Sequence, residues 1–187
     1  MTGRCDDSAG APGSCAEGLL LVDKPAGMTS HDVVSWARRR LGTRGVGHAG
    51  TLDPLASGLL PLLVGRATRL LRYLHDWPKT YVGFVLLGHE TETGDLEGLA
   101  PSDVVPAPLP PLSVLRAATA ALTGPLWQTP PAFSAKKVGG VPAHKLARRG
   151  LVPVLAPVRV TVHRLRVVAA GPGRLAFAAR VSSGTYL

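Results

Sequence analysis

Acidic residues are missing from a long part of this 187-residue chain. All 12 Asp and Glu lie at or before Asp103, whereas residues 104–187 contain 11 Lys and Arg. Such a basic segment favours a polyanionic partner, nucleic acid first, although a generally arginine-rich proteome would produce the same composition. The basic residues do not line one face of a long amphipathic helix, so an anionic membrane surface is a weaker candidate.

Cysteine and long apolar runs are also scarce, and each absence excludes a class of protein. The two cysteines, Cys5 and Cys15, have a spacing that supports neither a disulfide framework nor a zinc site. The first 17 residues are small and polar rather than signal-like, and no apolar run reaches membrane-spanning length. The six histidines are scattered without ligand spacing, so we expect no metal site. We expect a cytoplasmic protein without membrane segments.

The composition that remains predicts one globular α+β domain, because a hydrophobic content of 45% can form a sizeable core. Residues 1–17 are predicted to be a disordered leader, and residues 18–187 to form the domain. Within the domain, residues 128–156 are proline-rich and basic, and they are interpreted as an insertion with a mobile surface. Periodicity predicts strands over residues 18–23, 59–64, 79–88, 158–165 and 174–182, and helices over residues 30–41, 65–74, 112–122 and 143–149.

Asp53 is the acid that attracts most attention. It is the one charged residue of the glycine-rich stretch Gly47–Gly58, and Pro54 restricts its backbone to extended angles. A lone carboxylate on a stiff loop beside a buried strand is a candidate catalytic group. An Asx turn, in which Asp53 caps its own loop, is the structural alternative.

The same region also contains a misleading motif, since residues 45–50 match G-x-G-x-x-G. A dinucleotide site needs a strand before that motif and a helix after it. Here a helical pattern precedes the motif and Leu52-Asp53-Pro54 follows it, and no acid stands near the expected ribose position. We therefore exclude a nicotinamide or flavin site.

Several motifs together resemble the tRNA pseudouridine synthase B (TruB) family. They run in family order from residue 18 to the end of the chain, and as a set they are highly specific. The matching stretches are Asp23-Lys24-Pro25-Ala26-Gly27-Met28-Thr29-Ser30, Gly47 to Gly58, Lys79-Thr80-Tyr81, Pro131 to Lys137 and Ser183-Gly184-Thr185-Tyr186.

The resemblance implies a pseudouridine synthase fold, with a mixed, mostly antiparallel sheet flanked by helices, Asp53 in a central cleft and a thumb-like basic insertion. It implies isomerisation of uridine-55 in the T-loop of tRNA by a monomer that uses no metal and no organic cofactor. By resemblance Asp53 is the catalytic carboxylate, Tyr81 the stacking platform and Tyr186 the residue that takes or relays a proton. The RNA contacts that it implies are Lys24, His48, Lys136, Lys137, Lys145, Arg148 and Arg149.

One family feature does not appear in the sequence. The family continues beyond Gly-Thr-Tyr to an arginine that pairs with the catalytic aspartate, and here Leu187 is the last residue. We expect a catalytic domain that is incomplete at its C-terminus and poorly active or unstable by itself. A non-catalytic RNA-binding module or RNA chaperone is therefore the alternative function. A glycosidase-like hydrolase is a weaker one, because the other acids that it would need, Glu92 or Asp95, are distant in sequence.

Overall fold

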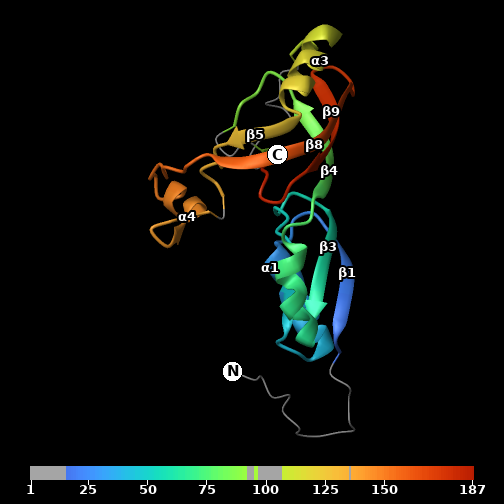
Figure 1. Cartoon of the computed structure of the whole chain (residues 1–187), viewed down its shortest axis with the longest axis vertical. Coiled ribbons are helices and arrows are strands. Elements are labelled where there is room, and N and C mark those ends of the chain that lie inside the picture. Colours follow the sequence, from blue (N-terminus) through green and yellow to red (C-terminus); the bar gives the residue numbers. More distant parts are fainter. Residues whose placement is uncertain (1–15, 92–94, 97–106, 135) are drawn as a thin grey trace, which may run out of the picture. The chain divides into compact units, whose positions relative to one another are not determined.

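The computed structural model describes residues 16–91, 95–96, 107–134 and 136–187, and its contacts divide into two compact units, residues 1–77 and 78–187. The first unit contains β1 (Gly18–Lys24), α1 (Ser30–Leu41), β2 (Val46–His48), β3 (Gly58–Val64), the 3-10 helix η1 (Gly65–Leu70) and α2 (Leu71–Leu74) (Figure 1). The second unit contains β4 (Lys79–Leu86), α3 (Leu112–Ala121), β5 (Gly124–Gln128), β6 (Lys137–Val138), β7 (Val141–Pro142), α4 (Ala143–Ala147), β8 (Val158–Ala169) and β9 (Arg174–Val181).

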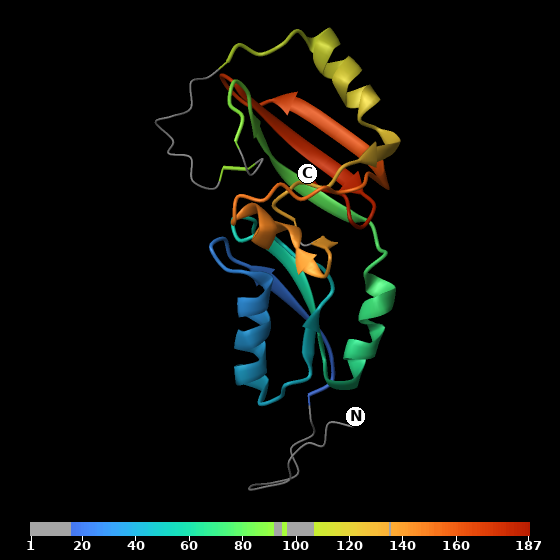
Figure 2. The same cartoon turned by 90° about the vertical axis from the view of Figure 1, so that its left-hand side faces the viewer.

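The first unit is built on an antiparallel sheet with strand order β1-β3-β2. Alternation along β3 directs Leu60, Leu62 and Val64 to one face, where they pack against Val33 and Val34 of α1. Burial of each of these side chains contributes about 1.5–3 kcal/mol before the cost of chain entropy. The other face carries the second helical segment, since Figure 2 shows α1 and η1–α2 on opposite sides of this sheet.

Both ends of α1 agree with the sequence prediction. Thr29 is the N-cap residue, and it forms a capping box with Asp32, whose carboxylate accepts from the Thr29 N–H at 2.9 Å. Gly42 closes the helix in the left-handed conformation at φ 61°, which glycine adopts without steric cost. Both ends of α1 are therefore fixed, the first by a capping box and the second by the left-handed conformation of Gly42.

The segment from Gly65 to Leu74 differs from the single helix that was predicted. It begins as the 3-10 helix η1, within which the Thr68 hydroxyl donates to the Gly65 carbonyl at 2.7 Å. Leu70, in the middle of the predicted helix, is 53% exposed. A 3-10 helix has three residues per turn, so Arg66 and Arg69 share one exposed face of η1. Arg72, in the α-helical turn α2, is exposed as well.

The second unit is built on a four-stranded antiparallel sheet with strand order β4-β9-β8-β5. One face is apolar, and its core is formed by Val162, Ala179 and Val181 with Tyr81, Leu126, Leu165 and Phe177 packed around them. β8 continues four residues beyond the predicted end at Leu165, because Arg166 to Ala169 continue to pair with β9. An irregularity in its pairing with β9 lies between Val162 and Arg164.

The expectation of one mixed, mostly antiparallel sheet needs correction. The described strands form three separate sheets, and every pair among them is antiparallel. Asp53 belongs to the unit with the three-stranded sheet, whereas Tyr81 belongs to the four-stranded one. The α+β class and the antiparallel pairing are confirmed.

Residues 128–156, interpreted from the sequence as an insertion, contain only short elements among those that the structure describes. β6 and β7, with two residues each, form a short antiparallel hairpin. The helix α4 ends at Ala147, two residues before the predicted end. No helix in the described part of the chain is long and apolar enough to cross a membrane. Most of the predicted leader 1–17, together with Cys5 and Cys15, lies outside the described residues.

Candidate active site

The backbone on both sides of Asp53 is held by hydrogen bonds from neighbouring elements. On one side, the Ser30 hydroxyl accepts from the Leu52 N–H at 2.9 Å and donates to the Leu52 carbonyl at 3.2 Å. On the other side, the Gly27 N–H donates to the Pro54 carbonyl at 2.7 Å. Asp53 itself is exposed. Neighbouring elements thus fix the backbone of this loop, and Asp53 is exposed to solvent.

Lys24 provides the second anchor of this loop, and its side chain is entirely buried. Its ammonium group donates to the carbonyls of Pro25 at 3.0 Å, Met28 at 2.7 Å and Pro54 at 3.4 Å. These three acceptors account for the three protons of a lysine ammonium group. Lys24 was expected to contact RNA, and its burial contradicts that expectation. The geometry gives it a positioning role, in which a buried cation ties the β1–α1 turn to the Asp53 loop.

His48 ends β2 with its ring partly buried. Its Nδ1 lies 2.5 Å from the Gly50 carbonyl oxygen. A carbonyl can only accept, so Nδ1 carries the proton and a neutral ring keeps Nε2 as an acceptor. The next residue is also fixed, because the Ala49 N–H donates to the Pro61 carbonyl of β3 at 2.9 Å. The start of the Asp53 loop is therefore held to the sheet.

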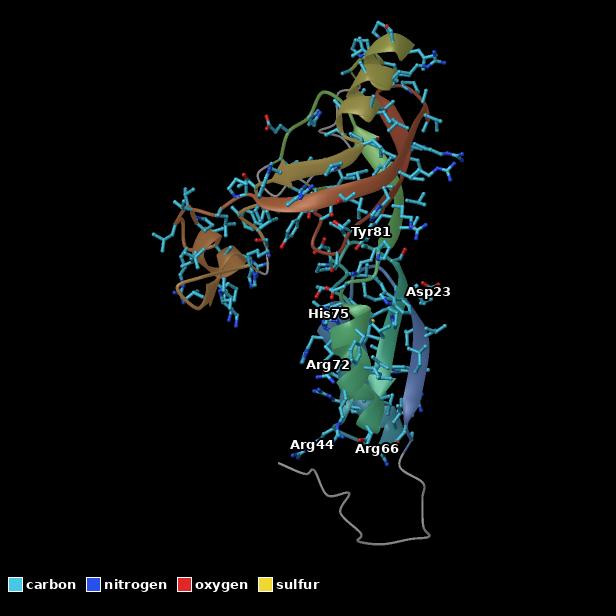
Figure 3. The ribbon with its side chains drawn as sticks, in the orientation of Figure 1. Asp23, Arg44, Arg66, Arg72, His75 and Tyr81 are labelled. Carbon is cyan, nitrogen blue, oxygen red and sulfur yellow. The ribbon has the colours of Figure 1, made fainter. Side chains whose placement is uncertain are left out.

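Tyr81 lies in the second unit, within β4, and pairs with Ala179 of β9 (Figure 3). It is half-buried and packs against the apolar core of the four-stranded sheet. A strand with neighbours in fixed register gives an aromatic ring a defined position. Such a ring can serve as a platform for a nucleobase.

Tyr186 lies in the loop after β9, and the side-chain amide of Gln128 holds its backbone. The Gln128 Oε1 accepts from the Tyr186 N–H at 2.9 Å, and the Nε2 donates to the Tyr186 carbonyl at 2.7 Å. Upstream, the Ser182 hydroxyl accepts from the Thr161 N–H at 2.9 Å. Neither Gln128 nor Ser182 stands in a sequence pattern that predicts a functional role, so their contacts become apparent only in the structure.

The basic residues predicted in the insertion are all exposed. The set consists of Lys136, Lys137, Lys145, Arg148 and Arg149. The turn that carries them is held together by His144, whose backbone N–H donates to the Ser134 carbonyl at 3.1 Å and whose Nδ1 lies 3.0 Å from the same oxygen. In the part of the chain that the structure describes, no three His, Cys, Asp or Glu side chains gather as a metal site.

Comparisons with known proteins identify the family of this chain. The family model described as TruB family pseudouridylate synthase (N-terminal domain) matches residues 38–187. A protein from Syntrophotalea carbinolica named tRNA pseudouridine synthase B is 44% identical over 170 residues, which cover 91% of this chain and 55% of the relative. A protein of the same name from Mycobacterium sp. (strain KMS) is 48% identical over 177 residues, covering 91% and 58%. The chain spans a little over half the length of these relatives.

Solved structures show the same relationship. A Cbf5–Nop10–Gar1 complex contains a chain with a TM-score of 0.66 and 27% identity, and the match covers 91% of this chain and 41% of that one. A structure of an H/ACA RNP bound to a substrate RNA containing 2′-deoxyuridine gives a TM-score of 0.61 and 25% identity, covering 90% and 39%. This chain belongs to the TruB family of pseudouridylate synthases and corresponds to the N-terminal domain of that family.

Proposed function

We propose that this chain carries the catalytic residues of a tRNA pseudouridine synthase, which isomerises uridine-55 in the T-loop to pseudouridine. The observation that carries the proposal is the Asp53 loop. The residues before and after Asp53 are fixed by Ser30, Gly27 and Lys24, while Asp53 is exposed. A carboxylate with a fixed backbone and an accessible side chain is suited to nucleophilic or electrostatic catalysis.

The reaction needs no water and no redox partner, because it rearranges one nucleotide. The bond between ribose C1′ and uracil N1 breaks, and the detached base turns so that C5 faces C1′. The Asp53 carboxylate either forms a transient C1′–O bond or stabilises an oxocarbenium-like ribose. A C5–C1′ bond then forms, any C1′–O bond breaks to restore the carboxylate, C5 loses its proton and N1 gains one.

The other residues bind and orient the RNA in this proposal. Tyr81 stacks against the flipped base, which offsets the few kcal/mol that unstacking costs by roughly 1–3 kcal/mol. Tyr186 takes or relays the C5 proton, with its backbone fixed by Gln128. His48 contacts the RNA through Nε2 at the position that the base has left. The exposed cations of the insertion contact phosphates, and such contacts position the RNA without reading its sequence.

The names of the relatives support a tRNA substrate, since the relatives matched above are named tRNA pseudouridine synthase B. The matched H/ACA RNP is bound to a substrate RNA containing 2′-deoxyuridine, which supports an RNA substrate with a uridine-like nucleotide. The non-catalytic alternative, an RNA-binding module, shares the basic insertion but has no use for the anchored Asp53 loop.

The test is tritium release from a T-arm hairpin labelled at uridine C5, with hairpin binding measured in parallel. Asp53→Asn preserves the shape of the side chain, so we expect release to fall by roughly a thousandfold or more with little loss of binding. Asp76→Asn is the matched control, because Asp76 is an exposed carboxylate in the same unit, and it should release tritium normally. Binding without release by both this chain and a C-terminally extended form would favour the RNA-binding alternative.

A further inference from the structure

One face of the four-stranded sheet in the second unit carries a cluster of exposed arginines, here called the arginine face. Its members are Arg159, Arg164 and Arg166 of β8 with Arg174 and Arg180 of β9. Strand register places three of them together, because Arg164 pairs with Arg180, and Arg166 pairs with Ala178, whose neighbours on that face are Arg180 and Ala176. Arg159 and Arg174 lie further along the same face, opposite Trp127 of β5 and Leu86 of β4. The opposite face of the same strands is the apolar core that contains Tyr81.

This solvent-exposed sheet face is unusual because two arginines, Arg164 and Arg180, lie directly opposite each other on neighbouring strands. Residues directly opposite on antiparallel strands have Cβ atoms about 4.5–5.5 Å apart, and like charges in that position destabilise the sheet. Within the described residues, no carboxylate lies within ion-pair distance of any of the five arginines. The sequence from residue 104 to 187 contains no Asp or Glu at all. The described residues thus offer this like-charge pair no counter-charge, and a bound polyanion would supply one.

Exposed aromatic side chains lie beside the arginines on this face. Trp127 of β5 pairs with Arg159 and is 72% exposed, and Phe84 of β4 is 58% exposed. The Arg174 guanidinium lies 4.4 Å from the centre of the Phe84 ring. Guanidinium groups pair with phosphates, and exposed aromatic rings stack on unpaired bases. This combination fits a nucleic acid better than an acidic protein surface or a membrane, neither of which offers bases to stack.

We propose that the arginine face is a second RNA-binding surface, which contacts a part of the RNA substrate that is distant from the reacting uridine. The proposal rests on the proposed function for the identity of the polyanion. Tyr81 and the arginine face lie on opposite sides of one sheet, so an RNA must pass around a sheet edge to reach both. A T-arm hairpin seated against Tyr81 is too small to do so, whereas a whole tRNA extends far beyond its T-loop.

The test compares Arg164→Gln/Arg180→Gln with a control of equal charge change, Arg40→Gln/Arg44→Gln, whose residues are exposed and belong to the first unit. Each lost phosphate contact lowers the slope of log K against log salt by about 1. For a whole tRNA transcript, we expect the slope to fall by about 2 in the first variant and to stay unchanged in the control. For the T-arm hairpin, both variants should bind like the unmodified chain.

Two further readouts separate a binding role from a folding defect. Removing the like-charge pair should leave the melting temperature unchanged or slightly higher, so weaker binding cannot be attributed to unfolding. The fluorescence of Trp127, read by comparison with Trp127→Phe, should be quenched by tRNA and less so in the Arg164/Arg180 variant.

The proposal fails under any of three results. Equal salt slopes for the variant and the control on tRNA would remove the arginines from the RNA interface. An equal loss with the hairpin would place them in the reacting site. Equally strong binding of polyglutamate, lost in the same variant, would assign the face to an acidic protein partner. Tritium release lost in Asp53→Asn bears on the proposed function alone, so the two failures are distinguishable.

Discussion

The Asp53 loop and the Tyr186 loop are held in different ways. The anchors of the Asp53 loop are buried: Lys24 is fully inaccessible and Ser30 is 3% exposed. The Tyr186 loop is held by Gln128, a half-buried side chain at the end of an edge strand. A buried donor cannot be replaced by water when it is lost, whereas a half-buried one can. The first loop is thus part of the folding of its unit, and the second is ordered by local contacts.

The two units also differ in charge. In the proposed function, the first unit supplies the catalytic carboxylate and the second unit supplies most of the contacts to RNA. The first unit holds the anchored carboxylate. The second unit holds the basic insertion and the arginine face, and the sequence from residue 104 onward contains no acid. Attraction for a polyanion is thereby concentrated in the second unit, whereas the geometry of the carboxylate loop in the first unit depends on buried hydrogen bonds that salt screens only weakly.

Lys24→Met should produce the largest effect of the variants that test this comparison. The substitution keeps the length of the side chain but leaves three carbonyls without the ammonium donor, which we expect to cost the first unit roughly 2–4 kcal/mol. Native-state hydrogen exchange of the β3 amides measures this loss, because those amides report on the core of that unit.

The matched control for Lys24→Met is the same change at exposed Lys145, which should alter the free energy of unfolding by less than about 0.5 kcal/mol. Protection of the β3 amides that is equal in the two variants would show that the buried ammonium does not hold the loop.

Gln128→Ala should have an intermediate and local effect. It removes two hydrogen bonds to the Tyr186 backbone, each with a net value of about 0.5–1.5 kcal/mol. We expect faster hydrogen exchange at the Tyr186 amide and, under the proposed function, kcat lowered roughly tenfold with little change in KM. The apolar core of the four-stranded sheet should keep its protection.

Gln128→Glu sharpens this prediction, because the carboxylate can still accept from the Tyr186 N–H but cannot donate to its carbonyl. An intermediate kcat is expected. If Gln128→Ala turned over substrate like the unmodified chain while its Tyr186 amide exchanged rapidly, fixing Tyr186 would be irrelevant to catalysis.

Asp32 should give the smallest effect, and one that depends on pH. The Thr29 hydroxyl, followed by the Thr29 N–H, holds the pKa of the Asp32 carboxyl below its usual value. A pKa that is lower in the folded state stabilises the fold above the unfolded pKa, near 3.9, and the contribution disappears as pH falls through the folded value. Asp32→Asn should therefore flatten the pH dependence of first-unit stability in the acidic range.

Denaturant unfolding at a series of acidic pH values measures that slope. Asp76→Asn, which removes an exposed carboxylate outside the capping box, is the comparison. Parallel stability curves for the unmodified chain and Asp32→Asn would mean that the capping box contributes nothing through ionisation.

Much of the molecule could be predicted from the sequence, for local reasons. The limits of α1 follow from Thr29 and Gly42, and the strands β1, β3, β4 and β9 follow from apolar runs and alternation. The order of the motifs along the chain is enough to indicate the family. These features depend on backbone preferences and residue periodicity, which act over a few neighbouring residues.

The tertiary structure decided what depends on contacts between distant residues. The sequence alone suggested Lys24 as an RNA contact, but folding brings Pro54 within 3.4 Å of its ammonium group and buries it. The assignment of Gln128 to Tyr186, 58 residues away, likewise has no local signal. Arg164 and Arg180 form a pair only through the register of β8 and β9, which a one-residue shift would reverse. The sequence thus determines which chemical groups are present and the local backbone structure. The partner of each side chain depends on long-range packing, which only the tertiary structure decides.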